Sequence, residues 1–369
     1  MKKISIIILA IMVLMAFGSC SRGQQSGQTV ETFELALITD VGTIDDKSFN
    51  QGSWEGLFQY AEEHNISRNY YQPAGVGDDA YLAAIDLAVR GGARVIVTPG
   101  FLFEPAIFIA QDRYPNVSFI LIDGEPNNGD WSAGAPTYRT NRNAVGVLYA
   151  EDQAGFLAGY AAVKDGYRRL GFMGGMAVPA VVRFGYGFVQ GAEYAAQELG
   201  LAPGSITINY HYTGNFIATP ENQTMAASWY NAGVEVIFAC GGAVGNSVMA
   251  AAEQAGGAVI GVDIDQADES RTVITSSMKG LQASVYACIR DFYANRFPGG
   301  QTIVMDARNL GVGLPMTTSR FRTFSQADYN AIFQTLVSGS IPRMLDDPNA
   351  GGSPVGVVPV TITSITEVR

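Results

Sequence analysis

Asp40-Val-Gly-Thr-Ile-Asp-Asp-Lys-Ser-Phe-Asn-Gln51 lies between an apolar run and an amphipathic segment that begins near Gly52. A strand, a polar loop with a glycine and a helix capped by Ser48 or Asn50 predict the first βα turn of an α/β sheet. Ligands of open parallel sheets bind just outside such strand ends. We therefore expect this loop to face a ligand. The alternative is a capped turn in which Phe49 is a hydrophobic staple.

The side chains of this loop favour the ligand-facing interpretation. Asp45, Asp46 and Asn50 offer hydrogen-bonding groups, and Phe49 adds an aromatic ring. This combination suits a flat, polar small molecule.

Length and composition bound the class of protein. With 369 residues, 47% of them hydrophobic and 15% charged, the chain can bury one large core or two medium ones. The net charge of −11 argues against a nucleic-acid partner, because phosphate contact needs clustered Lys and Arg.

The N-terminal segment has the pattern of an export signal. Lys2 and Lys3 precede the apolar stretch Ile4–Phe17, which is too short for a comfortable transmembrane helix, and two small residues then precede Cys20. This pattern resembles a bacterial lipobox, which predicts acylation of Cys20 and a lipid anchor at a bacterial membrane. A plain secretory signal is the alternative. Residues 21–33, rich in Ser, Gly and Gln, are predicted to be a flexible tether.

Neither the cysteines nor the histidines of the remaining chain predict a metal or cofactor site. Cys240 and Cys288 fit small buried hydrophobes, and their spacing leaves a disulfide between them open. His64 and His211 have no partner spacing typical of a metal site or a catalytic triad.

Short apolar runs alternate with amphipathic segments along the whole chain, and the rhythm restarts near its middle. This alternation predicts parallel sheets covered by helices, arranged as two similar lobes. We expect the first lobe to comprise residues 34–145 and about 267–300, and the second residues 146–266 and about 301–369. Crossings between the lobes are expected near Ala144, Gln266 and Gln301.

Polar or glycine-rich loops follow the expected strands in both halves. They include Thr98–Phe101 and Asp123 in the first half, and Gly242 and Asp263 in the second. If the lobes face each other, these loops converge on one interlobe cleft.

The chain resembles the basic membrane protein family, which includes purine nucleoside receptor lipoproteins of ABC importers. The resemblance runs from about Leu35 to Leu314. It rests on ordered matches at 45–51 (DDKSFNQ), 114–119 (YPNVSF), 154–159 (AGFLAG), 171–175 (GFMGG), 261–266 (GVDIDQ) and Lys279.

This resemblance implies a type I periplasmic binding protein fold of two doubly wound parallel-sheet lobes. It also implies roles for individual residues. Phe49 and Phe184 would stack on a purine; Asp45 or Asp46, Asn50 and Asp123 would address the base edge; Asp263, Lys279 and the backbone of Gly242 would hold the ribose; Phe101 completes the expected set. The alternatives are a core position for Phe184 and a surface position for Lys279.

The expected function is a monomeric, lipid-anchored receptor in the cell envelope. It would capture a purine nucleoside (inosine, guanosine or adenosine) and deliver it to the permease of an ABC importer. A receptor for sugars or other small molecules and a surface adhesin remain alternatives. An enzyme is disfavoured, because no nucleophile and general base can be assembled from the strand-end residues.

Overall fold

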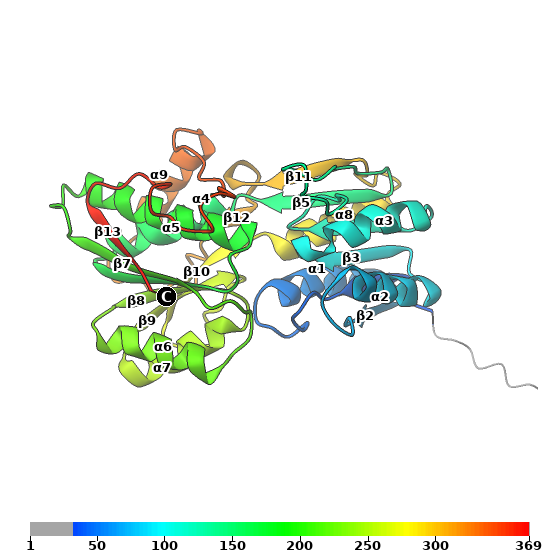
Figure 1. The fold of residues 1–369 in the computed structure, drawn as a ribbon. Coiled ribbons are helices and arrows are strands. Elements are labelled where there is room, and N and C mark those ends of the chain that lie inside the picture. Colours follow the sequence, from blue (N-terminus) through cyan, green and yellow to red (C-terminus); the bar gives the residue numbers. More distant parts are fainter. Residues whose placement is uncertain (1–31, 369) are drawn as a thin grey trace, which may run out of the picture. The chain divides into compact units, whose positions relative to one another are not determined.

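The structure, a computed structural model, describes residues 32–368. The expected signal segment, Cys20 and residues 21–31 of the expected tether lie outside this range. Within it, short runs rich in Val, Ile and Leu form the strands of two separate sheets (Figure 1). No helix among residues 32–368 is both long and apolar enough to cross a membrane.

The first sheet has six strands, all parallel, in the order β11-β5-β4-β3-β1-β2. Its strands are β1 (Leu35–Ile38), β2 (Arg68–Tyr71), β3 (Val95–Pro99), β4 (Ser118–Ile122), β5 (Ala144–Tyr149) and β11 (Gln301–Met305). Its helices are α1 (Phe49–His64), α2 (Asp78–Arg90), η1 (Phe101–Phe103), α3 (Glu104–Arg113) and α8 (Leu281–Tyr293). Successive side chains point to opposite faces, so Leu35 and Leu37 pack under α1 and α8, whereas Ala36 and Ile38 pack under α2 and α3.

The second sheet has seven strands in the order β12-β10-β9-β8-β6-β7-β13, and only β12 runs antiparallel. Its strands are β6 (Arg169–Gly174), β7 (Ile206–Tyr212), β8 (Val236–Cys240), β9 (Ala258–Asp263), β10 (Val273–Lys279), β12 (Val312–Gly313) and β13 (Thr363–Glu367). Its helices are α4 (Glu151–Lys164), α5 (Pro179–Glu198), α6 (Pro220–Asn231), α7 (Val244–Ala255), η2 (Ala307–Asn309) and α9 (Gln326–Val337). Helices α4 and α5 cover one face, and α6 and α7 cover the other.

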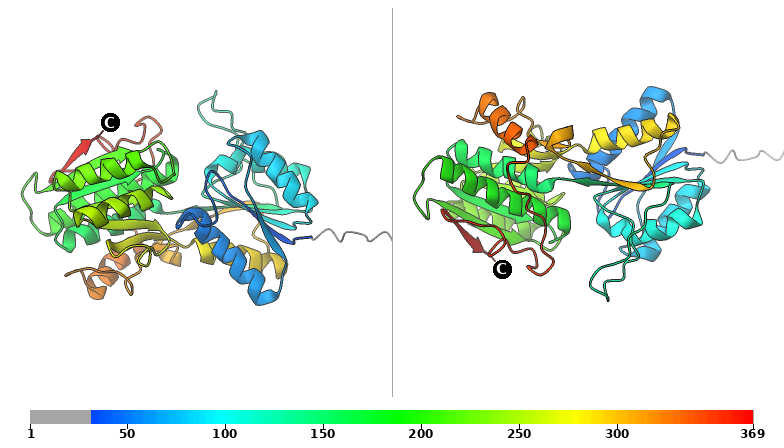
Figure 2. Two further views of the ribbon diagram at one scale, coloured as in Figure 1. Left: turned by 90° about the horizontal axis from the view of Figure 1, so that it is seen from below. Right: turned by 90° about the horizontal axis from the view of Figure 1, so that it is seen from above.

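Both sheets repeat one doubly wound topology. The run β2-β1-β3-β4-β5 in the first sheet and the run β7-β6-β8-β9-β10 in the second follow the same strand order. Such an order reverses direction beside the first strand, and the crevice at this switch point is where ligands bind. Figure 2 shows the two groups of elements from below and from above. The repeat explains why the alternating sequence pattern restarts near the middle of the chain.

The distribution of strands differs from the expected lobe ranges. β5 extends to Tyr149 within the first sheet, β10 pairs with β9 in the second, and β11 returns to the first beside β5. Within the range 267–300, α8, which packs on α1, and the residues that follow it lie with the first sheet. The crossings therefore lie after β5, between β10 and α8, and between β11 and β12. Local periodicity cannot predict this choice of sheet, because strand pairing is a long-range contact.

The backbones of helices α4 and α5 are in direct contact, because two glycines on each helix leave room for the backbone of the other. A methyl group at Gly155 of α4 would collide with the carbonyl oxygen of Phe184, and one at Gly187 of α5 would collide with that of Asp152. Gly159 and Gly191 repeat the arrangement one turn further along. Because nothing larger than glycine fits, this contact holds the beginning of α5 against the beginning of α4.

The C-terminal strand β13 is anchored to α5 by one carboxylate. Glu193, buried on α5, accepts hydrogen bonds from the backbone N–H groups of Thr361, Ile362 and Thr363 and from the hydroxyl of Thr361. Burial opposes ionisation of this carboxyl group, but these hydrogen bonds outweigh it and lower the pKa of Glu193 to about 2.

Replacing Glu193→Gln is expected to reduce the free energy of unfolding at pH 7 by roughly 1.5–3 kcal/mol, the usual value of hydrogen bonds to a charged group. Since the pKa is lower in the folded protein, the stabilisation is present above the ordinary value of 4.5 and is lost as the pH falls through about 2. Denaturant unfolding from pH 7 down to pH 2 measures both effects. Glu221→Gln, at an exposed position, is the control. A difference from wild type that stays constant over this pH range would contradict the assignment.

Candidate functional site

A cavity of about 760 Å³ lies where the strand ends of the two sheets meet. Its wall is built by the loops after β1, β3 and β4 of the first sheet, by the loops after β6, β7 and β8 of the second sheet, and by the last residues of β9 and β10. All ten expected ligand-binding residues line it: Asp45, Asp46, Phe49, Asn50, Phe101, Asp123, Phe184, Gly242, Asp263 and Lys279. Because both sheets have the same strand order and meet at their strand ends, residues from distant parts of the chain lie around one cavity.

Asp46 organises the loop after β1. Its carboxylate accepts hydrogen bonds from the backbone N–H groups of Ser48, Asn50 and Gln51 and from the side-chain amide of Asn50. Ser48 precedes α1 as the N-cap residue, but its side chain makes no capping bond. Asp46 therefore takes the capping role that the sequence suggested for Ser48 or Asn50, and its carboxylate is largely occupied by the loop. Asp45 is exposed and accepts from Thr43.

Lys279, at the end of β10, is the central charge of the cavity. Its Nζ lies 2.5 Å from Oδ2 of Asp123 and 3.4 Å from Oδ1 of Asp263, and its side chain is only 3% exposed. Asp123 follows β4 in the first sheet, whereas Asp263 ends β9 in the second. One buried ammonium group therefore joins acidic strand ends of both lobes.

Burial and pairing shift the pKa values of this cluster. Burial raises the pKa of Asp123 to about 7, although the Lys279 ammonium group lowers it. For Lys279, burial alone would lower the pKa, but Asp123 and Asp263 raise it above its ordinary value. The lysine therefore stays charged at neutral pH, and Asp123 changes protonation near neutrality.

Two aromatic rings from different lobes face the Lys279 ammonium group. The ring centroid of Phe49, at the start of α1, lies 4.5 Å from Nζ, and that of Phe184, on α5, lies 5.5 Å from it. Phe184 also packs edge-on against Phe238 at 5.9 Å and is 2% exposed. Phe184 thus combines the core position that the sequence left open with a place on the cavity wall.

Two buried oxygen atoms of the cavity residues have no hydrogen-bond partner within residues 32–368. They are Oδ1 of Asn50 and Oδ1 of Asp123. The amide nitrogen of Asn50 donates to Asp40 and Asp46, which fixes the direction in which its oxygen points. Buried acceptors without partners are costly, so both atoms are suited to accept hydrogen bonds from a ligand.

Direct hydrogen bonds also connect the two lobes beside the cavity. The hydroxyl of Ser48 donates to Oδ2 of Asp263 at 2.5 Å, and the amide of Gln266 donates to the backbone oxygen of Lys47 at 2.5 Å. The loop after β1 therefore contacts the loop after β9 directly. Each carboxylate oxygen has two lone pairs, so Asp263 can accept further hydrogen bonds from a ligand.

The sequence did not single out several other residues of the cavity wall. Trp131 and Tyr138 belong to the stretch after β4, while Phe216 and Asp346 come from later parts of the second lobe. The stretch 124–140 is rich in Gly, Pro and Asn and follows a strand end, which is a signal that could have drawn attention to it. No local signal marks Asp346.

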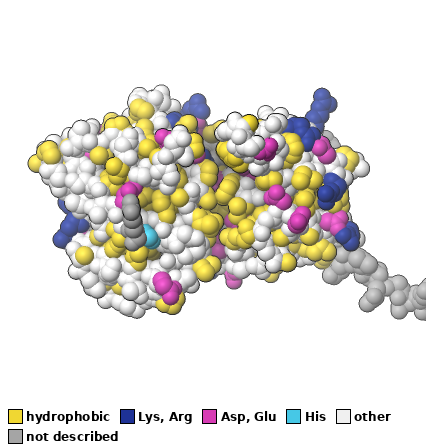
Figure 3. All heavy atoms as spheres, in the orientation of Figure 1, with side chains coloured by type: hydrophobic (Ala, Val, Ile, Leu, Met, Phe, Trp, Pro, Cys, Tyr) yellow, Lys and Arg dark blue, Asp and Glu magenta, His cyan; other side chains and the backbone are white. Residues whose placement is uncertain are grey.

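Neither the cysteines nor groups of metal-binding side chains form a further site within residues 32–368. Cys240 and Cys288 are buried and unpaired, which resolves the question of a disulfide between them. Residues 32–368 contain no cluster of His, Cys, Asp or Glu suited to a metal ion. On the face drawn in Figure 3, Lys and Arg side chains are dispersed among acidic ones.

The raised pKa of Asp123 predicts that the stability of the folded protein depends on pH. Since burial raises this pKa from 3.8 to about 7, the folded state binds the proton more tightly than the unfolded state. The resulting stabilisation is complete below about pH 3.8 and is lost as the pH rises through about 7. In Asp123→Asn this decline should disappear. The melting temperature of the wild type should therefore fall more between pH 5 and pH 8 than that of the variant. Asp268→Asn, at an exposed position, should follow the wild type. Parallel curves for Asp123→Asn and wild type would contradict the prediction.

Two solute-binding proteins of ABC transporters are among the solved structures with the same arrangement. One from Aeropyrum pernix superposes with a TM-score of 0.73 at 23% identity, covering 86% of this chain and 95% of its own. One from Conexibacter woesei superposes with a TM-score of 0.67 at 22% identity, covering 85% and 100%. The expected type I periplasmic binding protein fold, with its parallel sheets and alternating helices, is thereby confirmed.

Sequence comparison leads to the same group of proteins. The chain is 26% identical over 343 residues to an "ABC transporter nucleoside-binding protein BmpA" of Lactococcus lactis subsp. cremoris, covering 86% of this chain and 92% of the relative. It is 28% identical over 315 residues to "Basic membrane protein B" of Borreliella burgdorferi, covering 82% and 88%.

A family model described as "ABC transporter substrate-binding protein PnrA-like" matches residues 33–341. Both the expected resemblance to the basic membrane protein family and the expectation of a non-enzymatic binding protein are therefore confirmed. The chain belongs to the PnrA-like family of ABC transporter substrate-binding proteins.

Proposed function

We propose that this protein is a lipid-anchored receptor that captures purine nucleosides in its interlobe cavity and delivers them to the permease of an ABC importer. The observation that carries the proposal is the pairing of Phe49 and Phe184, one ring from each lobe, beside the buried charges of Asp123, Asp263 and Lys279. The relative from Lactococcus lactis is named for nucleoside binding, which supports the same ligand class.

Each part of a nucleoside has a suitable partner in the cavity. The two rings can stack on the faces of the base, and the unpaired oxygens of Asn50 and Asp123 can accept its N–H groups. Asp263 can accept hydrogen bonds from the vicinal hydroxyls of ribose, and Lys279 can donate to them. Gly242, in the left-handed conformation with φ +55°, turns the chain after β8 and leaves its backbone close to the cavity.

The charge of the cavity disfavours phosphorylated ligands. Asp40, Asp45, Asp123 and Asp263 all line the cavity, and Lys279 is already paired with Asp123 and Asp263. A phosphate group would add further negative charge to this environment. We therefore expect nucleosides to bind and nucleotides to be rejected.

Titration calorimetry with inosine, guanosine, adenosine, adenine and ribose tests the ligand class. At least one purine nucleoside should bind much more tightly than its free base or free ribose, because both ends of the molecule have partners. Phe49→Ala and Phe184→Ala should each weaken nucleoside binding by about one to two decades, since one stacked base contributes roughly 1–3 kcal/mol.

Phe58→Ala is the matched control for the aromatic variants, because Phe58 also lies on α1 but is 41% exposed outside the cavity. Its nucleoside affinity should equal that of the wild type. Tight binding of ribose without a response to any nucleoside would replace the nucleoside assignment by that of a sugar receptor.

The lipid anchor is a separate prediction about Cys20. Acylation at this residue should place the mature protein in the membrane fraction of the cell envelope, where it acts as a monomer beside its permease. Cys20→Ala should release the protein into the soluble fraction or leave it unprocessed, as measured by fractionation and mass spectrometry of the N-terminal peptide. Ser21→Ala is the control. An unchanged distribution with no lipid on the peptide would rule out the anchor.

A further inference from the structure

A second cation lines the cavity and has no role in the nucleoside contacts described above. Arg183 lies on α5 directly before Phe184, and its side chain is only 14% exposed. Lys279 is paired with Asp123 and Asp263. Arg183 is instead paired with Glu151 and Asp346, and it lines the cavity together with Glu104 of the first lobe. The two cations therefore have different carboxylate partners.

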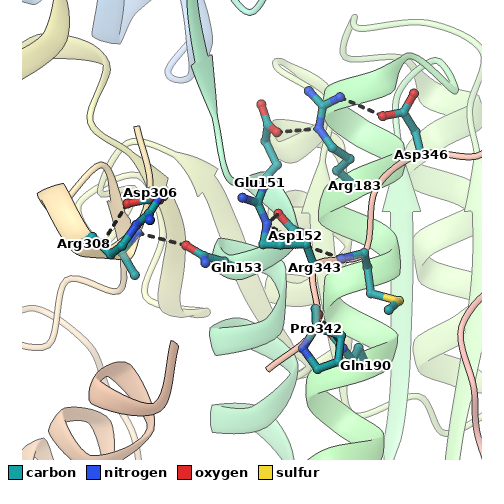
Figure 4. A network of polar contacts seen from close by, with 12 residues as sticks. Glu151, Asp152, Gln153, Arg183, Gln190, Asp306, Arg308, Pro342, Arg343 and Asp346 are labelled. Atoms are coloured by element: carbon teal, nitrogen blue, oxygen red, sulfur yellow. Dashed lines mark hydrogen bonds and ion pairs between the residues drawn. The ribbon is translucent and has the colours of Figure 1, made fainter. Parts of the chain in front are cut away.

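The guanidinium group of Arg183 is held by two carboxylates. Its Nε donates to Oε2 of the fully buried Glu151 at 2.7 Å, and Nη1 donates to Oδ1 of Asp346 at 2.8 Å (Figure 4). Burial alone would lower the pKa of Arg183, but the two carboxylates raise it. The group is thus charged and fixed in orientation before any ligand binds.

The third nitrogen of this group is free to meet a ligand. Within residues 32–368, Nη2 of Arg183 donates no hydrogen bond, and it is not among the fully buried unpaired atoms. In Figure 4 dashed lines join two of the guanidinium nitrogens to Glu151 and Asp346, and the third nitrogen carries no dashed line. A rigid donor with an unused N–H group is therefore available at the cavity wall.

The C-terminal segment that holds Arg183 is itself firmly attached. Nε of Arg343 lies 2.8 and 2.6 Å from the two carboxylate oxygens of Asp152, and the backbone N–H of Met344 donates to the same group at 2.9 Å. Gln190 donates to the backbone oxygen of Pro342 at 2.9 Å. This segment lies beyond residue 341, where the family match ends, so the contact from Asp346 falls outside the matched region.

The charge around Arg183 selects the kind of group that it can bind. Glu151 and Asp346 together outweigh its single positive charge, so an anionic ligand group gains little there. A neutral acceptor, such as a carbonyl oxygen or a ring nitrogen, can accept from Nη2 without adding charge. A 6-oxopurine presents O6 and N7 as adjacent acceptors, whereas adenine replaces O6 by an amino donor.

The unpaired oxygens on the opposite lobe favour the same bases. Oδ1 of Asn50 and, in the carboxylate form, Oδ1 of Asp123 can accept from N–H donors. A 6-oxopurine carries a hydrogen on N1, next to O6, whereas N1 of adenine is a bare acceptor that would oppose these oxygens. Nη2 of Arg183 and the oxygens of Asn50 and Asp123 thus match the acceptor O6 and the donor N1–H of a 6-oxopurine.

We propose that Arg183 is a specificity-determining residue that donates from Nη2 to the O6 edge of the base, so that inosine and guanosine bind in preference to adenosine. The proposal rests on the nucleoside-receptor function proposed above. Asp346 acts as a positioning residue, because it orients Arg183 without contacting the base.

Titration calorimetry with inosine, guanosine, adenosine and nebularine, a purine riboside without O6, tests this assignment. The wild type should bind inosine about tenfold or more tightly than adenosine or nebularine. In Arg183→Met this ratio should fall towards one, chiefly through loss of inosine affinity. Arg183→Lys keeps a positive charge beside Glu151 but removes the planar fork, and it should also lose the preference. Because the readout is a ratio, a general loss of stability does not mimic it.

Arg322→Met is the control, since it removes an ion pair with Asp165 at a residue that neither lines the cavity nor belongs to the segment that holds Arg183. It should keep the wild-type ratio. Equal affinity of the wild type for inosine and adenosine, or an equal loss for all ligands in both Arg183 variants, would overturn the role of Arg183 while leaving nucleoside binding intact. No response of the wild type to any nucleoside would overturn the proposed function itself.

Discussion

The buried ammonium group of Lys279 is the interaction on which the rest of the site depends. A charge that is removed from water must be paired, and its partners here are Asp123 and Asp263, which end strands of different sheets. The pairing therefore brings the carboxyl ends of both sheets together around one cavity. Ser48, which donates to Asp263, adds a second polar contact between the same strand ends.

The other walls of the cavity are held by contacts that exist before a ligand arrives. Asp46 caps α1 and thereby orients Phe49 and Asn50 at the helix start. On the opposite side, the glycine contact between α4 and α5 holds Phe184 in place. A site whose groups are already ordered loses less conformational entropy on binding, so more of the contact energy contributes to affinity.

Several features of the site could be predicted from local sequence signals. The polar loop between an apolar run and an amphipathic segment correctly predicted a βα turn, and Asp263 was recognised because it directly follows a buried run. Other details were not predictable in this way. The sequence offered Ser48 or Asn50 as the helix cap, but Asp46 serves instead, because the two oxygens of its carboxylate accept from three backbone N–H groups. Asp346 reaches the cavity only because the C-terminal segment folds back over α4 and α5.

The sequence pattern by itself determined the α/β class, the two similar lobes and most strand-end loops of the site, and these follow from hydrophobic periodicity and helix capping, which act over a few neighbouring residues. The doubly wound topology and the roles of single residues were implied by the family resemblance. Only the tertiary structure decided that β10 joins the second sheet and β11 the first, that Lys279 pairs with Asp123, and that Asp346 fixes Arg183. Each of these depends on contacts between residues far apart in the chain, and such contacts leave no local pattern because they are selected by the packing of the whole fold.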